Sequence, residues 1–592
     1  MLRNAADGFR FALSIVETTA TIPRHRMERA RTLQPDHDPR ERAFARTLAV
    51  PDLVARVLLA RGIDDPERAR QHLKPDLGNL HDPFAFRGME RAVARIRAAV
   101  RQREPILVHG DYDVDGVAGT VLLLKLFALI GGDARAHIPD RRHGYSFNQS
   151  SAEAISQGGI KLCVSVDNGT NACDWIGRIE ASGCDVIVTD HHGTTENVAR
   201  CHAMLNPRLP DAGYPDKELA GCGVAFQLAT AVAQSFSREK KLSDEFREFL
   251  VDAMTYVALG TIADVAPLRG ENRVLVHHGL RALAVSANPG IRALLDSAGL
   301  SNRSPEAEDV AFRIAPLLNA AGRMGHASEA LALLMARDSQ SAQAAAKVLE
   351  GHNQERRKVE RALLEVVLAQ ARNRPEPIIV LGGDDWHPGV LGIVAARVAE
   401  TLLKPTLLVA FDGAKGRGSG RSVPGFDLRA VLARASASLL AHGGHAAAVG
   451  FELEKARLDE FRARINAEAA GCLQAPTAFT PDGHAHLQEL DPRDVRKLDL
   501  LGPFGTGNRR PTFRSLVQLV GMPSVDSRSL DLRFRVAQDG TLLPARWRHN
   551  SLERFEMLRA QKELVEVVYT PRVALWGEDG PVELQITAVG CG

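Results

Sequence analysis

Three aspartates within one short segment give the first indication of chemistry in this sequence. The segment "PILVHGDYDVDG", residues 105–116, places Asp111, Asp113 and Asp115 at alternate positions behind an apolar run. Carboxylates that lie close together and are partly buried repel one another and lose hydration, so a positive charge is expected among them. A calcium loop also begins D-x-D-x-D-G, but it needs a bidentate Glu at its twelfth position, where this chain has Leu122. Taken alone, the segment would be interpreted as a solvated acidic turn.

Metal-type residues recur behind further apolar runs. Asp167 follows "LCVSV", Asp190, His191 and His192 follow "DVIVT", and Asp264 follows "ALGTIA". If each run is a strand of an open parallel sheet, these side chains converge on one crevice at the carboxyl ends of the strands. Mixed carboxylate and imidazole ligands suit Mn²⁺ or Mg²⁺, and two such ions can activate a water and neutralise a phosphate. The sequence therefore predicts a metal centre at four strand ends.

The elements that must position these residues follow two α/β patterns and one β pattern. From about residue 50 to 340, strand-like runs alternate with helical patterns, which predicts a parallel sheet. Residues 339–373 contain no Pro and predict a long connecting helix. A second α/β pattern follows, in which 427–444 is expected to be a helix that stops at its two final glycines. From about residue 480, short strand-like runs between turns predict a small β-barrel.

The composition is typical of a globular protein of several domains. The chain has 592 residues, of which 45% are hydrophobic and 25% charged. Its formal net charge is +2, so a nucleic-acid partner cannot be inferred from overall charge and any basic surface must be local. Seven cysteines without a CxxC pair fit a reducing cytoplasm. No run approaches the roughly 18 apolar residues of a membrane span, so none is expected.

The metal motifs resemble those of a known group of enzymes. "DYDVDG", "VDNG", "TDHH" and "GTIADV", in this order, are similar to the four metal motifs of the DHH phosphoesterase superfamily. Within it, the chain resembles the bacterial RecJ exonucleases, and this resemblance extends through "LAGCGVAF", "NAAGRMG", "WHPGVLGIVAAR", "GSGRS", "GGH" and "PFGTGN". It covers about residues 50–592. The motif set is highly specific as a group.

The resemblance and the patterns together imply five segments. They are a poorly ordered N-terminal extension over residues 1–48, a DHH catalytic domain over 49–338, a connecting helix over 339–373, a DHHA1-type nucleic-acid-binding domain over 374–475 and an OB-fold single-strand-binding domain over 476–592. The expected fold class is therefore α/β, with a parallel-sheet DHH domain, a second smaller α/β domain and a C-terminal OB-like barrel.

The resemblance also assigns roles at the metal centre. Asp167 matches the ligand that bridges two ions, His192 orients the site or the attacking water, and Asp111 supports the ligands. The implied metal ligands are His109, Asp113, Asp115, Asp167, His191 and Asp264, and the implied catalytic residues are Asp167, His191, His192 and Asp111. Taken singly, each His could be a structural residue; the ordered set favours metal binding.

Phosphate contacts are expected from the second α/β pattern. In "GSGRS", Ser419 and Arg421 offer a hydroxyl and a guanidinium beside backbone donors, and the glycines before His445 leave it exposed. The resemblance adds Arg323, Arg397, Arg141 and His387 to these DNA-binding residues. Three departures weaken it locally: Leu317 stands where the family has Arg, Val449 where a small residue is usual, and Ser146 where Gly is usual.

The activity that the resemblance implies is 5′→3′ degradation of single-stranded DNA in repair and recombination, with two Mn²⁺ or Mg²⁺ ions. The expected partners are single-stranded DNA, a single-strand-binding protein and a helicase, and the protein is expected to be a cytoplasmic monomer. Two alternatives stay open. One is a DHH phosphodiesterase for short oligoribonucleotides or cyclic dinucleotides, which generally lacks the β-rich module, and the other is a non-catalytic DNA-binding scaffold, which has lost metal ligands.

Overall fold

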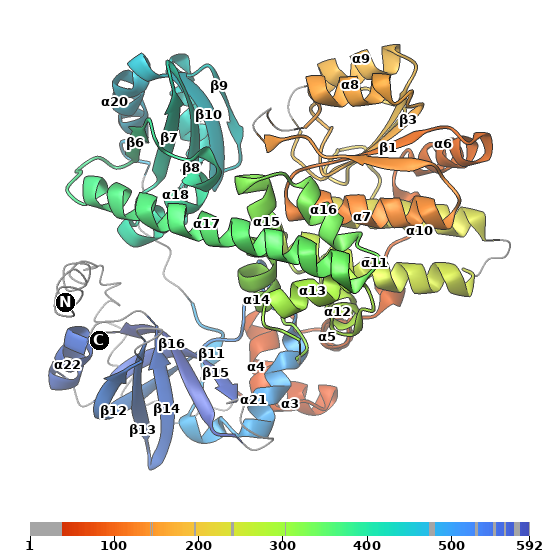
Figure 1. The fold of residues 1–592 in the computed structure, drawn as a ribbon. Coiled ribbons are helices and arrows are strands. Elements are labelled where there is room, and N and C mark those ends of the chain that lie inside the picture. Colours follow the sequence, from red (N-terminus) through yellow and green to blue (C-terminus); the bar gives the residue numbers. More distant parts are fainter. Residues whose placement is uncertain are drawn as a thin grey trace. The chain divides into compact units, whose positions relative to one another are not determined.

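The structure is a computed structural model that falls into two compact units. It describes residues 38–590 except 142, 143, 145, 195, 196, 238–241, 302, 473–479, 527–530, 549–551, 562, 563 and 574–579. The large unit comprises Asp76–Pro476 with Gly505–Asn508, and the terminal unit comprises Met1–Pro75, Thr477–Phe504 and Arg509–Gly592. The terminal unit therefore contains segments from both ends of the chain (Figure 1).

The first sheet of the large unit is parallel throughout, as predicted. Its strands run in the order β2-β1-β3-β4-β5. Their bounds are β1 Ile106–Gly110, β2 Ala134–His137, β3 Leu162–Val166, β4 Asp185–Thr189 and β5 Ala203–Leu205. Every residue of β1 and β3 is buried, because helices cover both faces of a parallel sheet.

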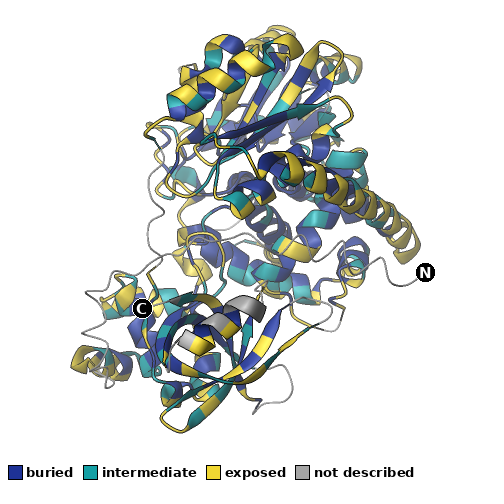
Figure 2. Ribbon diagram, turned by 90° about the vertical axis from the view of Figure 1, so that its left-hand side faces the viewer, coloured by how far each residue is buried: buried dark blue, intermediate teal, exposed yellow. Residues whose placement is uncertain are grey.

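Two helical layers cover this sheet (Figure 1). Alternate strand residues belong to two different hydrophobic clusters, one with α6, α7 and α10 and one with α8 and α9. The helices are α6 Met89–Gln102, α7 Val114–Leu129, α8 Gln149–Gln157, α9 Cys173–Ala181 and α10 Gly221–Phe236. Figure 2 shows that helices at the surface of the molecule have buried residues on one side and exposed residues on the other.

A helical region follows the first sheet in the chain, and it contains one segment that was predicted to be a strand. The run "YVALGTIA" lies in the last turns of α11, Asp244–Ala263, and is not a strand. A short apolar run fits a buried strand and a buried helix equally well, and here it continues a helix that Ser243 caps. The region also contains α12 Gly270–Val285, α13 Pro289–Ser297, α14 Ala307–Asp309, the π-helical turn η5 Val310–Ile314, α15 Ala315–Met324 and α16 Ser328–Leu334.

The predicted connecting helix is a single helix, α17 Ser339–Ala371, of 33 residues. Asp338 caps it by accepting a hydrogen bond from the Ser341 N–H at 2.8 Å. The helix leads into a second sheet with the strand order β6-β7-β8-β10-β9. The bounds are β6 Ile379–Gly383, η6 Pro388–Val390, α18 Leu391–Leu402, β7 Thr406–Asp412, β8 Lys415–Arg421, α19 Leu428–Arg434, β9 Ala441–Gly444, β10 Ala448–Glu454 and α20 Leu458–Ala469.

The predicted helix over 427–444 is wrong in its second half. α19 ends at Arg434, and Gly443 and Gly444 pair with Gly450 and Val449 of β10 as part of a strand. "GSGRS" likewise belongs largely to β8 and is not a simple turn. These pairings form between strands, so the local pattern of apolar residues does not reveal them.

The C-terminal sheet closes into a barrel, as predicted. Its strands run in the order β11-β12-β13-β14-β16-β15, and β12 also pairs with β15. The bounds are β11 Gly483–His484, α21 Pro492–Lys497, β12 Phe513–Val525, β13 Leu532–Gln538, β14 Thr541–Trp547, α22 Leu552–Gln561, β15 Val565–Val573 and β16 Val582–Gly590.

The N-terminal helices share the core of this barrel. They are α3 Pro39–Leu48, α4 Asp52–Ala60 and α5 Pro66–Leu73. Leu53 and Val57 of α4 belong to the same hydrophobic cluster as Phe513 and Val567 of the barrel. The expected disorder of residues 1–48 lies mostly outside the described residues, but its last ten residues form α3. No helix in the described part of the chain combines the length and apolar character needed to cross a bilayer.

Candidate metal centre and phosphate-binding residues

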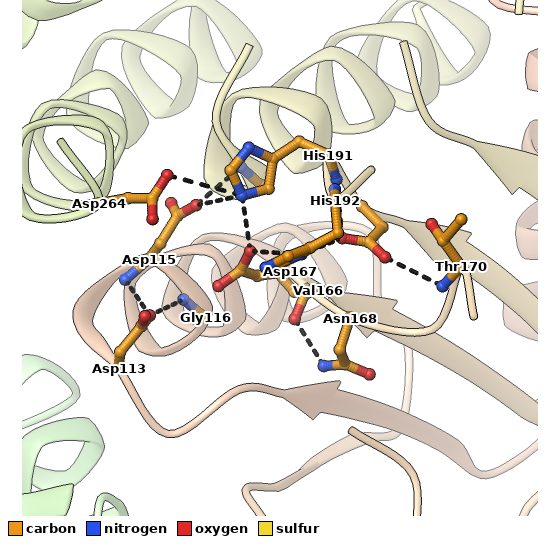
Figure 3. A network of polar contacts seen from close by, with 12 residues as sticks. Asp113, Asp115, Gly116, Val166, Asp167, Asn168, Thr170, His191, His192 and Asp264 are labelled. Carbon is orange, nitrogen blue, oxygen red and sulfur yellow. Dashed lines mark hydrogen bonds and ion pairs between the residues drawn. The ribbon is translucent and has the colours of Figure 1, made fainter. Parts of the chain in front are cut away.

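The metal-type residues do converge at the carboxyl edge of the first sheet (Figure 3). Asp111 follows β1, and Asp113 caps α7 by accepting hydrogen bonds from the N–H groups of Asp115 at 2.9 Å and Gly116 at 3.2 Å. Asp167 follows β3 with φ 63°, a left-handed conformation that Asp tolerates better than most residues. The strand-end prediction is confirmed for these loops.

The start of α10 holds Asp115 in place. The backbone N–H groups of Gly221 and Cys222 donate to the two carboxylate oxygens of Asp115 at 2.7 and 3.0 Å. A Cβ at Gly221 would lie 2.7 Å from the Cβ of Asp167, and one at Gly260 would lie 2.4 Å from Asp115 Oδ1. Both glycines are therefore required by the close approach of α10 and α11 to the carboxylates.

His191 lies at the centre of the cluster. Its Nε2 is 3.1 Å from Asp167 Oδ1, 3.6 Å from Asp264 Oδ2 and 3.9 Å from Asp115 Oδ2 (Figure 3). Burial is the main reason that the pKa of His191 is lowered to about 3, so the imidazole is neutral near pH 7. Neutral imidazole is the form that binds metals. Asp264 reaches this cluster from the C-terminal end of α11, so the fourth contribution comes from a helix end and not from a strand end.

His192 has the opposite charge state. Burial opposes its protonation, but the hydrogen bond and charge of Asp190 outweigh it and raise the pKa of His192 to about 9. The two side chains are 2.8 Å apart, and Asp190 also accepts from the N–H groups of His191 at 2.7 Å and Thr170 at 2.9 Å. His192 is thus a fixed cation beside the cluster.

Burial and mutual repulsion disfavour the ionised form of the remaining carboxylates. Burial is the main cause of the raised pKa of Asp111 and Asp167, and repulsion from neighbouring aspartates adds to it. The same two causes raise the pKa of Asp115 to about 6 and that of Asp264 to about 8. Asp111 Oδ1 and His191 Nδ1 are buried, and neither atom has a hydrogen-bond partner among the described residues. The oxygens and nitrogens form three groups with metal-ligand spacing: Asp111, Asp113 and Asp167; Asp115, His191 and Asp264; Asp167, His191 and His192. Hard cations with oxygen and imidazole ligands fit this set.

His109 lies apart from these three groups. Its Nδ1 is 3.2 Å from Asn168 Oδ1 and its Nε2 is 2.8 Å from Ser151 Oγ. The ring also stacks on Phe147, with centroids 4.1 Å apart. Both ring nitrogens therefore have partners other than a metal, and the ligand role of His109 stays a prediction.

Three arginines gather next to the Asp111 side of the centre. Arg323, at the end of α15, donates to Gly389 O at 2.9 Å, and Arg421, at the end of β8, donates to Ser419 Oγ at 3.2 Å. Arg141 lies over the Tyr112 ring at 4.9 Å. Burial and then the charges of Arg141 and Arg421 lower the pKa of Arg323 to about 9, and burial and Arg141 lower that of Arg421. Cations that repel one another in a buried place are suited to an anion.

The other predicted phosphate contacts have mixed surroundings. His445 lies near His192, with ring centroids 6.3 Å apart. His387 uses Nδ1 to accept from the Gly389 N–H at 3.1 Å. Arg397 pairs with Glu360 at 2.9 Å, so its guanidinium already has a carboxylate partner. Leu317, where the family has Arg, is buried in the helical core and contributes packing instead of charge.

Sequence reasoning missed two buried asparagines. Asn168 donates to Val166 O at 2.8 Å and holds His109, while Asn206 donates to Thr170 Oγ1 at 2.8 Å and His192 O at 2.9 Å. Asn168 was visible within "VDNG", but Asn206 follows β5, a strand of only three residues that no pattern reveals.

Comparisons with known proteins agree with this arrangement. The DHH family, N-terminal domain, matches residues 105–261, the DHHA1 domain matches 376–471 and the RecJ OB domain matches 481–588. The single-stranded-DNA-specific exonuclease RecJ of Dickeya dadantii is 34% identical over 84% of this chain and 88% of that protein. RecJ of Bacillus subtilis is 33% identical over 81% of this chain, which spans 60% of that relative's length.

Solved structures give the same result. RecJ of Thermus thermophilus in complex with Mn²⁺ matches with a TM-score of 0.80 and 31% identity, over 93% of this chain and 78% of that one. The same protein in complex with Mg²⁺ matches with a TM-score of 0.74 and 30% identity, over 93% of this chain and 77% of that one. The cluster, the arginines, the three domains and the extent of these similarities lead to one conclusion: this chain belongs to the RecJ family of the DHH phosphoesterases.

Proposed function

We propose that this chain is a metal-dependent exonuclease that hydrolyses single-stranded DNA from its 5′ end, using two Mn²⁺ or Mg²⁺ ions. The observation that carries the proposal is the buried carboxylate–imidazole cluster, whose raised aspartate pKa values mark carboxylates that need a bound cation to be ionised near pH 7. The solved relatives bound to Mn²⁺ and Mg²⁺ support this choice of ions.

The residues of the cluster have different roles in hydrolysis. Bound divalent ions would supply an activated water and neutralise the charge of the scissile phosphate. Asp167 and His191 each belong to two of the three ligand groups, so we assign them to shared positions. The cationic His192 adds a fixed positive charge where negative charge develops on the phosphate.

The arginines select the end of the strand. Arg141, Arg323 and Arg421 adjoin Asp111, and a terminal 5′ phosphate in this place would place the first internucleotide bond at the metal centre. Charge-assisted hydrogen bonds from guanidinium to phosphate are strong and geometrically specific. The proposed 5′→3′ polarity follows the resemblance to the RecJ exonucleases, and the arginine group supplies a place for the terminal phosphate.

The barrel favours a long substrate. OB folds bind single strands along a basic groove with stacking aromatics, and this chain carries the RecJ OB domain over residues 481–588. Short-substrate phosphodiesterases do not need such a module. A non-catalytic scaffold is disfavoured because the cluster retains carboxylates in all three ligand groups and imidazole in two of them.

The setting of the enzyme is also part of the proposal. The described cysteines are free thiols, which fits work in a reducing cytoplasm. We assign a role in DNA repair and recombination, with a single-strand-binding protein and a helicase as partners and a monomer as the working form.

The proposal is tested with a single strand labelled separately at each end. In Mn²⁺, we expect a 5′ label to be released at once as a mononucleotide and a 3′ label to remain on progressively shorter strands. EDTA should stop both. Early release of the 3′ label would contradict the polarity, and full activity in metal-stripped protein would contradict the metal mechanism.

A further inference from the structure

The loop after β5 is a further part of the carboxyl edge that carries the metal centre. β5 is followed by Asn206 and Arg208, on the side of the sheet beyond the His191 loop. Asn206 is fully buried, and its amide donates to His192 O at 2.9 Å and to Thr170 Oγ1 at 2.8 Å. Its Oδ1 accepts from the Arg208 N–H at 2.9 Å. One side chain thus ties together the loops after β3, β4 and β5.

The Arg208 guanidinium is only loosely engaged. Its Nε is 3.4 Å from Lys217 O, and its Nη2 is 3.6 Å from Glu218 Oε2, which is too long for a good hydrogen bond. The Arg208 side chain is 34% exposed and that of Glu218 is 51% exposed, and exposed ion pairs of this kind are weak. The guanidinium therefore keeps donors for a ligand.

The charge of Arg208 acts on one flank of the centre. Burial is the main reason for the lowered pKa of His191 and of His445, and the positive charges of His192 and Arg208 lower both further. Burial is the main reason that the pKa of Asp264 is raised to about 8, and the positive charge of Arg208 acts in the opposite direction. Arg141, by contrast, acts on Asp111. Cationic groups thus adjoin two different ligand groups.

We propose that Arg208 binds a backbone phosphate of the DNA on the Asp264 and His445 side of the metal centre, and that Asn206 positions it there. The inference rests on the proposed function. With the 5′ phosphate on the Arg141, Arg323 and Arg421 side and the scissile phosphate at the metals, Arg208 contacts the next phosphate, on the 3′ side of the cleaved bond. This makes Arg208 a substrate-binding residue and Asn206 a positioning residue.

A substrate series locates the contact. The substrates are a 5′-phosphorylated trinucleotide, the same trinucleotide with an uncharged methylphosphonate at its second internucleotide position, and a 5′-phosphorylated dinucleotide that lacks this phosphate. Arg208→Ala should lower kcat/KM for the trinucleotide about 10- to 100-fold, as expected for a lost hydrogen bond to a charged group. It should leave the other two substrates nearly unchanged. Arg208→Lys should restore part of the loss.

Two controls accompany the series. Arg434→Ala removes an arginine whose partner is the exposed Glu468 at 3.0 Å, and it should change none of the three rates. Asn206→Ala should resemble Arg208→Ala in its selectivity for the trinucleotide, with an additional loss from the displaced His192 loop. Melting temperatures verify that the variants fold.

The outcomes separate this inference from the proposed function. A parent protein that cleaves neither these substrates nor a long 5′-phosphorylated single strand would overturn the proposed function and this inference with it. A parent that cleaves all three while Arg208→Ala slows them equally, or slows none, would leave the nuclease intact and overturn the phosphate contact.

Discussion

Buried charges have opposite roles in the two units. In the terminal unit, Arg56 joins Glu41 at 2.8 Å and Glu489 at 2.9 Å, and Arg61 joins Asp482 at 2.9 Å. Burial would raise the pKa of Asp482, but the hydrogen bond and charge of Arg61 outweigh it and lower the pKa. In the metal centre of the large unit, burial raises the pKa of Asp167 and Asp264, and repulsion from neighbouring aspartates raises it further.

The direction of the shift reflects the neighbours of each aspartate, because Asp482 lies beside Arg61 whereas Asp167 and Asp264 lie beside other aspartates. Paired charges fasten α3 and α4 to the barrel, and their cost of burial is offset inside the protein. Carboxylates that repel one another leave that offset to a ligand, which makes perturbed aspartates a sign of a functional site.

The largest effect is expected from Asp167→Ala. The variant removes a carboxylate that belongs to two ligand groups, so turnover on single-stranded DNA should fall at least about 1,000-fold, equivalent to roughly 4 kcal/mol. Binding of DNA should be largely kept, because the arginines remain. Turnover comes from single-turnover kinetics and bound metal from elemental analysis; normal cleavage with both metals retained would refute the shared-ligand role.

The next effect concerns the paired side. Arg56→Ala leaves Glu41 and Glu489 without their common cation, and removing one partner of a buried pair typically costs about 3–5 kcal/mol. Denaturant unfolding should show this loss in the terminal unit, whereas cleavage of a dinucleotide should be unchanged. A loss below about 1 kcal/mol would show that the pair behaves as a surface ion pair.

A smaller effect is expected at the arginine group. Arg421→Ala should weaken binding of a 5′-phosphorylated strand about 10- to 100-fold and affect a strand with a 5′ hydroxyl much less. Fluorescence anisotropy with both strands measures the difference, and Arg434→Ala is the matched control. Equal weakening for both strands would mean that Arg421 does not contact the terminal phosphate.

The sequence predicted the parallel sheet, the long helix and the barrel because each has a strong periodic pattern. It also predicted that Asp111, Asp167 and His191 meet, since strand ends of a parallel sheet share an edge. It misassigned the run before Asp264, because a short apolar run fits both a helix and a strand.

Contacts between residues far apart in the chain could not be predicted from the sequence. Arg56 binds Glu489, which lies more than four hundred residues further along the chain. No local pattern indicates that the N-terminal helices contribute to the core of the barrel. Asn206 was not predicted for a similar reason, because its hydrogen bonds are made to residues of two other loops.

The most direct measurement follows the stability of the large unit against pH, with and without metal. The pKa of Asp264 is raised to about 8 in the folded protein and is about 3.9 in an unfolded chain, so the folded state binds more protons between these values. Its contribution to stability is therefore fully present below about pH 4 and is lost as pH rises towards 8.

Calorimetry of metal-free protein, with Arg56→Ala to identify the transition of the terminal unit, gives the test. The melting temperature of the large unit should fall between about pH 6.5 and pH 8, above the range in which buried neutral histidines such as His191 take up protons on unfolding, and Mn²⁺ should raise it by an increment that grows with pH. A melting temperature that is independent of pH without metal, or unaffected by Mn²⁺ at pH 8, would contradict the claim that the cluster is built for cations.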